Sequence, residues 1–370
     1  MADQDHIRGL TGLRGVAAAW VLLLHLWQFS GGVRHPLSLA GWTFDPTWLL
    51  SCGYFGVDLF FVLSGFLLSM PWHRAAEQGT PAPSLVRFWH NRVRRVLPAY
   101  WLQLLILVGA YAWLGHFDRI QPTNIAAHLG LVQNLWGGGQ LLNPVYWSMP
   151  IEWDFYVALP LLAFLMFRAP AWLVALFALT WSLTYRLLAY LGWFDPAIAQ
   201  YIGYPSIHQL PARLDQFVYG MFAAWILIRR PNWVRQPRWW LAAGLVGILA
   251  MVVGAGPRDD FLIRFDAPWL FFHHSLLAAA FALVILGVAA GSQLGRQLFA
   301  GRVMVWFGLI SYSLYLWHYP LLQVWQYLAG AGWFAGWLLA ALFGLATPLI
   351  LLVSWLSYRY VELPFLAMKK

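Results

Sequence analysis

The chain has 370 residues and a formal net charge of +9; 61% of its residues are hydrophobic and only 10% are charged. Because soluble domains carry about 25% charged residues, this composition excludes an ordinary soluble enzyme. The positive charge gives little support for nucleic-acid binding, since basic residues in short segments between apolar runs follow the positive-inside rule. The single cysteine, Cys52, excludes an internal disulfide and argues against a cysteine metal site.

Apolar runs recur along the whole chain and predict an all-α, polytopic membrane bundle of about ten transmembrane helices, with N-in and C-in orientation. The expected spans begin near residues 9, 53, 98, 146, 170, 212, 239, 268, 303 and 334. This orientation leaves all but six of the 23 Lys and Arg residues on the cytoplasmic side. Residues 120–136 could add a further or re-entrant segment.

The first apolar run, residues 10–29, lacks a small-residue cleavage site, so we expect a retained span rather than a signal peptide. No linker or soluble-looking block interrupts the pattern, and residues 1–370 are therefore expected to form a single integral membrane domain. We expect it in the bacterial cytoplasmic (inner) membrane, where its lipids would be partners of the chain.

Arg14 and His25 lie eleven positions apart within this first run. In a helix that spacing separates them by roughly 16 Å along the axis and returns both to the same face. A charged side chain inside an apolar helix costs roughly 2.5–3.5 kcal/mol or more, so the pair indicates a polar pathway or site.

Other expected spans also carry polar residues, and five helices should bring a histidine, a carboxylate or both to about one depth in the outer half of the membrane. This convergence predicts a buried reaction chamber. Each residue also has a structural interpretation: a histidine can join two helices, and Asp58 or Asp215 can simply neutralise an arginine. The residues concerned are His25, Asp58, Glu152, Tyr156, Arg213, Asp215, Ser311, Tyr315 and His318.

A histidine close to a carboxylate suits general-base catalysis, so His25 is the predicted base, and Glu152 is expected to orient or charge it. Tyr156, Ser64 or His318 could stabilise an oxyanion, and the expected substrate contacts are Asp58, Arg213, Asp215 and Tyr315. Arginines at the cytoplasmic mouth suit phosphate binding; these are Arg14, Arg92 and Arg95. Acyl-coenzyme A has the matching shape, a phosphorylated head and a long thin arm ending in a thioester.

Several motifs make the chain resemble the acyltransferase-3 family of integral membrane acyltransferases along nearly its whole length. The opening GLTGLRGVAAAWVLLLH resembles the family's first-span motif, a basic residue and a histidine separated by ten others. FGVDLFFVLSGFLL resembles the second-span signature, and FWHNRVRRVLPAYW resembles the arginine-rich segment before span three. WSMPIEWDFY, RLDQFVYGM, SYSLYLWHYPL and SYRYVELP are similar to later blocks in the same order. At Asp215 many relatives carry glutamate instead.

The resemblance implies transfer of an acyl group, most often acetyl from cytoplasmic acetyl-CoA, to a hydroxyl of a carbohydrate or glycolipid acceptor at or across the membrane. No metal is expected. Some relatives carry an additional SGNH hydrolase-like domain, whereas this chain ends at Lys370 without one. We therefore expect direct transfer, or hand-off to a separate protein.

Two other classes of function remain open from the sequence. Intramembrane histidines and carboxylates also serve proton relays, so the chain could be a proton-coupled transporter or glycolipid flippase. It could also be a scaffold subunit of a polysaccharide-export complex. The choice of acceptor is expected to depend on the loops of the outer side, residues 30–50, 116–145 and 191–211.

Overall fold

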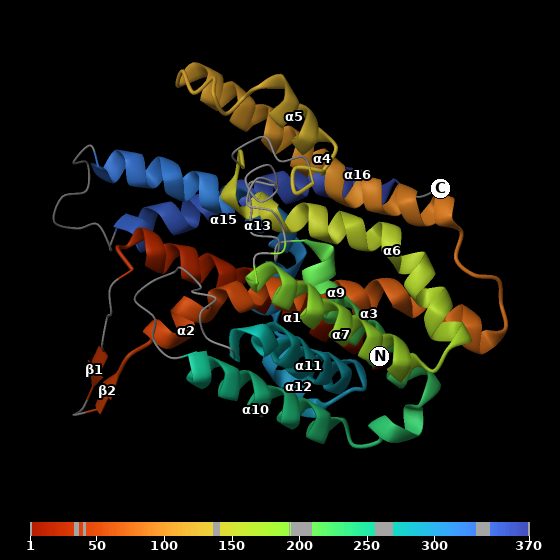
Figure 1. Ribbon diagram of the computed structural model, residues 1–370. Coiled ribbons are helices and arrows are strands. Elements are labelled where there is room, and N and C mark those ends of the chain that lie inside the picture. Colours follow the sequence, from red (N-terminus) through yellow and green to blue (C-terminus); the bar gives the residue numbers. More distant parts are fainter. Residues whose placement is uncertain are drawn as a thin grey trace.

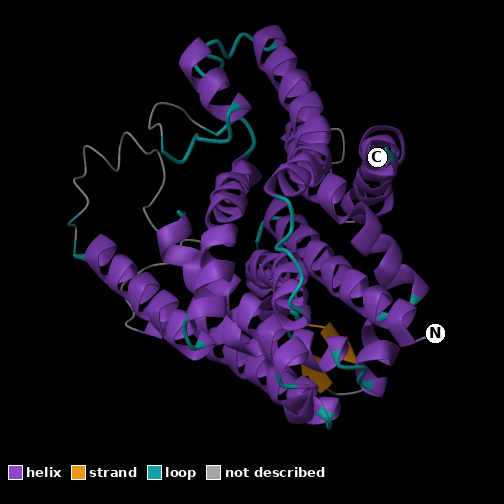
Figure 2. Cartoon of the chain, turned by 90° about the vertical axis from the view of Figure 1, so that its right-hand side faces the viewer, coloured by secondary structure: helices purple, strands orange, loops and turns teal. Residues whose placement is uncertain are grey.

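The computed structural model describes residues 2–32, 37–39, 42–135, 141–191, 193, 209–255, 269–330 and 341–368. Helices make up almost all of this described part (Figures 1 and 2). The strands in it are β1 (Leu37–Leu39) and β2 (Trp42–Phe44), which form a short antiparallel hairpin. The predicted helical membrane bundle is therefore confirmed.

Eight of the described helical stretches are long and apolar enough to cross a membrane, or nine if one bent pair counts as a span. The count is close to the predicted ten. They comprise α1 (Ala2–Phe29), α2 (Thr47–Ser51) with η1 (Cys52–Tyr54) and α3 (Phe55–Gln78), α4 (Leu85–Trp113), η2 (Pro144–Trp147) with α6 (Ser148–Arg168), α7 (Ala171–Tyr190), α10 (Pro237–Ala255), α11 (Trp269–Ala289), and the C-terminal run η5 (Leu342–Ala346), α15 (Thr347–Ser357), η6 (Tyr358–Glu362) and α16 (Leu363–Ala367). The bent pair is α12 (Gln293–Phe299) and α13 (Arg302–Gly330), with an angle of 66° between them.

Four expectations about the spans need correction or qualification. The third span does not start near residue 98, because α4 already begins at Leu85 and continues through Pro98. Of residues 120–136 the structure describes 120–135, and the helix found there is α5 (Pro122–Leu129), which is too short to cross a membrane. The expected sixth span is α9 (Leu210–Arg229), which is outside the apolar set because its first turns are polar. The expected start near residue 334 lies outside the described residues.

Small residues allow the central helices to approach each other closely, as is common in membranes. Where α1 crosses α13, Gly308 faces the backbone carbonyl of Thr11, and a side chain at Gly308 would overlap it. Where α3 crosses α9, Gly65 faces the backbone carbonyl of Phe217 in the same way. These two crossings bring α1, α3, α9 and α13 together in the middle of the bundle.

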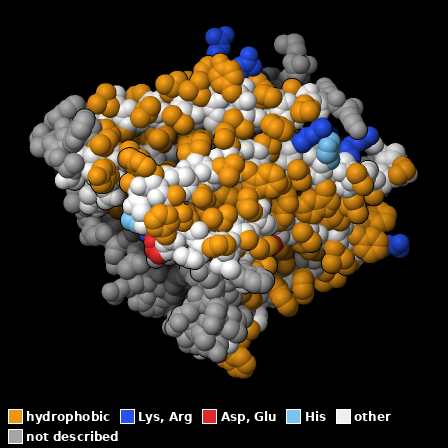
Figure 3. All heavy atoms as spheres, turned by 90° about the horizontal axis from the view of Figure 1, so that it is seen from above, with side chains coloured by type: hydrophobic (Ala, Val, Ile, Leu, Met, Phe, Trp, Pro, Cys, Tyr) orange, Lys and Arg blue, Asp and Glu red, His pale blue; other side chains and the backbone are white. Residues whose placement is uncertain are grey.

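The face of the molecule shown in Figure 3 is mostly hydrophobic, with only a few arginine side chains among its described residues. Such a surface fits lipid contact, since a soluble monomer rarely exposes apolar patches of that extent. Both ends of the chain and the beginning of α4 lie on the right-hand side of Figure 1. The described helices therefore place both termini on one side of the bundle, as the expected orientation requires.

Candidate active site

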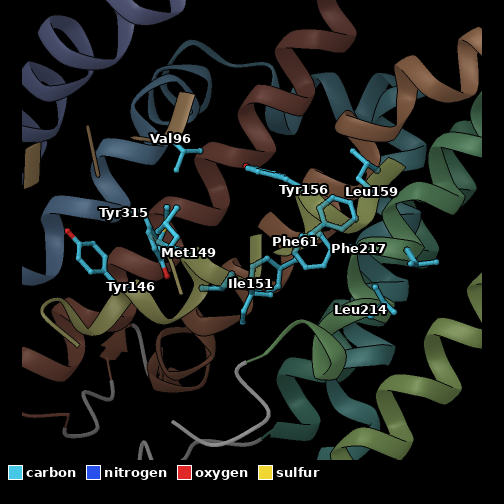
Figure 4. Close-up of a cluster of buried hydrophobic side chains, with 14 of the residues drawn as sticks. Phe61, Val96, Tyr146, Met149, Ile151, Tyr156, Leu159, Leu214, Phe217 and Tyr315 are labelled. Atoms are coloured by element: carbon cyan, nitrogen blue, oxygen red, sulfur yellow. The ribbon is translucent and has the colours of Figure 1, made fainter. Parts of the chain in front are cut away.

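A cavity of about 310 Å³ lies between α1, α3, α4, α6 and α13. Eight of the residues predicted for the site or its polar stripe line it: Arg14, Ser64, Arg92, Arg95, Glu152, Tyr156, Ser311 and Tyr315. Apolar side chains form most of the remaining wall, among them Phe61, Val96 and Met149, which Figure 4 shows with Tyr156 and Tyr315. Polar groups placed among apolar and aromatic side chains in a concave site are typical of small-molecule binding.

A second, wider cavity of about 870 Å³ opens beside the first, and both are lined by Arg14, Arg92 and Arg95. Its wall also includes Arg87 and Arg94, and among the described residues that line it there is no carboxylate side chain. We call this wider cavity the cationic mouth. The Nε atoms of Arg14 and Arg92 are buried and have no hydrogen-bond partner within the described part of the chain. The mouth therefore has donors and positive charge to offer an anionic ligand.

Glu152 lies on α6 at the edge shared with the arginines. Its Oε1 accepts a hydrogen bond of 2.8 Å from the hydroxyl of Ser64 on α3. The charges of Glu152 and Arg14 are close enough to interact, and the guanidinium of Arg92 lies 5.8 Å from the ring centroid of Tyr156. The predicted carboxylate, serine and tyrosine are therefore brought together with the arginines in one cavity.

His25 lies on α1 and is paired with His318 on α13. Nδ1 of His25 and Nε2 of His318 are 3.0 Å apart, and Nδ1 of His318 lies 2.9 Å from the carbonyl oxygen of Leu314. Both imidazoles are buried, with exposed fractions of 9% for His25 and 1% for His318. The ring of Tyr315, which lines the cavity, lies 5.9 Å from the ring of His318. The histidine pair is therefore one aromatic ring away from the cavity.

The structure does not join His25 to Glu152 as the sequence led us to expect. Within the described residues no hydrogen bond connects them, because Glu152 is bonded to Ser64 and His25 to His318. His25 faces the interior through α13, whereas Glu152 faces α3 and the arginines. A catalytic role for each residue stays a prediction, but direct orientation of His25 by Glu152 has no contact to support it.

Asp58, Arg213 and Asp215 do not line the cavity, which corrects the expectation of a single chamber holding every polar residue. Asp58 accepts hydrogen bonds from Arg213 at 3.1 Å and Gln216 at 2.8 Å, and Nδ1 of His274 lies 3.1 Å away. Both carboxylate oxygens of Asp215 accept hydrogen bonds from Arg186, at 2.9 and 3.0 Å. These carboxylates neutralise arginines between α3, α7, α9 and α11. A structural role in joining these helices is therefore enough to explain the contacts of Asp58 and Asp215. Their part in substrate binding stays a prediction.

Glu362 is a site residue that the sequence analysis did not single out. It is 1% exposed, and its Oε2 accepts a hydrogen bond of 2.7 Å from Arg95, while Ser313 bonds to its other oxygen. It lies at the end of the π-helical segment η6, within the SYRYVELP block. The sequence does contain a signal for Glu362, because an acidic residue inside an apolar C-terminal span needs a polar or charged partner.

A second missed group supports the helix that carries His318. Pro320 has no N–H to offer the carbonyl of Leu316, four residues earlier. The amides of Gln103 and Asn143 bond to this carbonyl instead, at 2.6 and 3.0 Å. The WHYP sequence could have predicted an unsatisfied carbonyl here, but not which side chains would reach it.

Comparison with known proteins decides the family. Residues 7–359 match the acyltransferase-3 family model, described as an acyltransferase domain. The chain belongs to this family of membrane acyltransferases. BcsY of Komagataeibacter xylinus, named as a membrane-bound transacylase, is 28% identical over 96% of this chain and 82% of its own length. The O-acetyltransferase OatA of Staphylococcus aureus is 24% identical over 98% of this chain and 58% of its own length.

A protein of Staphylococcus aureus strain COL, named as an O-acetyltransferase, is 25% identical over 97% of this chain. The chain spans 57% of the length of that relative and 58% of the length of OatA. No solved structure matches the chain. The contacts of the arginines, Glu152 and His25 described above come from the structure of this chain.

Proposed function

We propose that this acyltransferase moves a short acyl group, most often acetyl, from cytoplasmic acyl-CoA to a hydroxyl of a carbohydrate or glycolipid at or across the bacterial inner membrane. The observation that carries the proposal is the shared wall of the two cavities, formed by Arg14, Arg92 and Arg95. An extended ligand with an anionic head and a slender reactive arm fits a cationic mouth that opens into a narrower, mostly apolar cavity. The O-acetyltransferase names of the relatives support the same chemistry.

In this proposal the phosphates of the donor bind the arginines of the cationic mouth. Guanidinium groups bind phosphate oxygens through two parallel hydrogen bonds, which are stronger than neutral ones. Arg95 is already held by Glu362 at 2.7 Å, so its charge is positioned before the donor arrives. The pantetheine arm then enters the smaller cavity and carries the thioester towards Tyr315 and the histidine pair.

The reaction requires a base for the acceptor hydroxyl. Nε2 of His25 takes the hydroxyl proton while the acceptor oxygen forms a bond to the thioester carbon. The carbon–sulfur bond then breaks, and the CoA sulfur leaves with the proton that Nε2 held. The products are the O-acyl acceptor and free CoA, and His25 returns to its starting state.

The transient oxyanion needs a hydrogen-bond donor. In neutral His318 both ring nitrogens are engaged, one with Leu314 and one with His25. The remaining candidates are the hydroxyls of Ser64 and Tyr156, which line the cavity. The Ser64 hydroxyl donates to Glu152 in this structure and would have to turn from it to donate to the oxyanion. Removal of one such donor in other enzymes costs about 10²–10³ in rate.

The test uses inverted membrane vesicles from a strain that carries the gene and from the same strain without it, supplied with radiolabelled acetyl-CoA. We expect base-labile label in membrane acceptors only when the protein is present, and loss of at least about 100-fold for His25→Ala. The variant should remain folded in detergent. Absence of label with the native protein, or undiminished labelling by His25→Ala, would contradict the proposal. Proton-driven solute uptake without labelling would instead favour a transporter.

A further inference from the structure

The hydrogen bonds around His318 determine which nitrogen of its ring carries a proton. Nδ1 lies 2.9 Å from the carbonyl oxygen of Leu314. A carbonyl oxygen can only accept, so Nδ1 must donate and must carry hydrogen. In the neutral ring the other nitrogen, Nε2, is therefore an acceptor.

The same reasoning extends to His25. Its Nδ1 lies 3.0 Å from Nε2 of His318, and a hydrogen bond between the two requires one donor and one acceptor. Since His318 supplies the acceptor, Nδ1 of His25 carries hydrogen. The lone pair of neutral His25 is then on Nε2, the atom that a general base needs to have free.

We propose that His318 is a positioning residue, which holds His25 in the tautomer whose Nε2 can accept the hydroxyl proton of the acyl acceptor. The inference rests on the proposed acyl transfer and extends it by naming the orienting group and the basic atom. In many hydrolases a carboxylate orients the histidine; here a second, neutral imidazole takes that place. His318 also anchors this pair of histidines, the His25–His318 dyad, to the backbone of α13 through its hydrogen bond to Leu314.

The dyad also suits the charge that develops during the reaction. When Nε2 of His25 takes the proton from the acceptor, the His25 ring becomes cationic, and its Nδ1–H forms a stronger, charge-assisted bond to Nε2 of His318. When the CoA sulfur leaves with that proton, His25 becomes neutral again. His318 neither gains nor loses a proton in the full cycle.

Aromatic packing keeps the dyad in place. The ring of Tyr319 lies 5.0 Å from the ring of His25 at a near-perpendicular angle of 87°. The ring of Tyr315 lies beside His318, and its hydroxyl is 2.6 Å from the hydroxyl of Ser148. These neighbours restrict rotation of both imidazoles. The Nε2 atom of His25 therefore has a fixed direction as well as a fixed protonation state.

Two substitutions separate positioning from a purely structural role. In His318→Gln the side-chain oxygen can take the place of Nε2 and accept from His25, but the contact with Leu314 is lost. In His318→Asn the amide can still donate to Leu314, but it is too short to reach His25. Val324→Ala, at a side chain on α13 that is 56% exposed, is the control for a change in the same helix.

The assay measures transfer from radiolabelled acetyl-CoA in inverted vesicles, normalised to folded protein. We expect His318→Gln to keep at least about one tenth of the native kcat and His318→Asn to fall by about 100-fold or more, since a histidine in the wrong tautomer loses up to about 10⁴ in kcat. The KM for acetyl-CoA should change by less than about threefold in both.

Equal activity of the two variants, higher activity of His318→Asn, or a change confined to KM would overturn the inference while leaving acyl transfer intact. Absence of transfer by the native protein would overturn the proposed function as well. A second measurement covers variants that fold poorly: in a His25→Ala background, His318→Asn should lower the residual rate per folded molecule no further. An additional loss there would show that His318 acts independently of His25.

Discussion

The carboxylate of Glu362 accepts a hydrogen bond of 2.7 Å from Arg95, which joins the last helices of the chain to the wall of the cationic mouth. The two residues are 267 positions apart. Glu362 is 1% exposed and Arg95 17% exposed, so the pair is largely removed from solvent. In this environment the charge of Arg95 and the charge of Glu362 each need the other to offset the cost of burial.

Glu362→Ala should therefore lower the free energy of unfolding by about 3–5 kcal/mol, because it leaves the Arg95 charge buried and unpaired. Glu77 pairs with Arg229, but its side chain is 48% exposed. The control Glu77→Ala should cost no more than about 1 kcal/mol. Unfolding in detergent measures both, and equal stabilities would refute the structural role of the Arg95–Glu362 pair.

Arg92→Gln tests the donor site, since Arg92 lines both cavities and its buried Nε has no partner in the described part of the chain. A lost charged hydrogen bond is worth about 1.5–3 kcal/mol, so the KM for acetyl-CoA should rise by about ten- to a hundredfold. The kcat should stay within about threefold, as expected for an interaction made equally in the ground and transition states. Arg230→Gln, which removes an arginine outside both cavities, is the control. A fall in kcat with unchanged KM would place Arg92 in the chemical step instead.

Asp58→Asn distinguishes a structural from a substrate-binding carboxylate. Asp58 is 2% exposed and accepts from Arg213 and Gln216. Loss of its charge removes the buried ion pair with Arg213, so we expect destabilisation by about 3–5 kcal/mol. Acetyl-CoA KM and kcat per folded molecule should stay close to native. A stable variant that has lost transfer would show that Asp58 belongs to the substrate site, as its sequence position suggests.

Gln103→Leu tests the support of α13 at Pro320. Gln103 donates to the Leu316 carbonyl at 2.6 Å and accepts from Tyr146 at 2.7 Å. Its replacement should cost about 1–3 kcal/mol, the penalty for leaving buried polar groups unsatisfied. Pro320→Ala supplies a backbone N–H to Leu316, so the double variant should be more stable than the sum of the single effects predicts. Strict additivity of the two changes in unfolding free energy would argue against this coupling.

Much of the site was predictable because polar residues in an apolar chain are rare and costly. Arg14, Glu152 and Tyr156 could each be recognised as interior residues from hydropathy and helical periodicity. The expected depths separated them, with Arg14 at the cytoplasmic mouth and the other two in the outer half, whereas the structure brings all three into one cavity. The arginines of α4 could be assigned to its entrance for the same reason. The carboxylates of α3 and α9 were also recognised as interior, but not as partners of Arg213 and Arg186.

The sequence by itself determined the class of the molecule, its approximate spans and the side chains that had to avoid lipid, because hydropathy and helical period are local properties of the chain. Only the tertiary structure decided the partners: His25 with His318, Glu152 with Ser64, and Glu362 with Arg95. Depth in the membrane restricts each polar residue to a layer. The choice of neighbour within that layer depends on how each helix is rotated and which helices touch, and this is set by close packing between segments far apart in the chain.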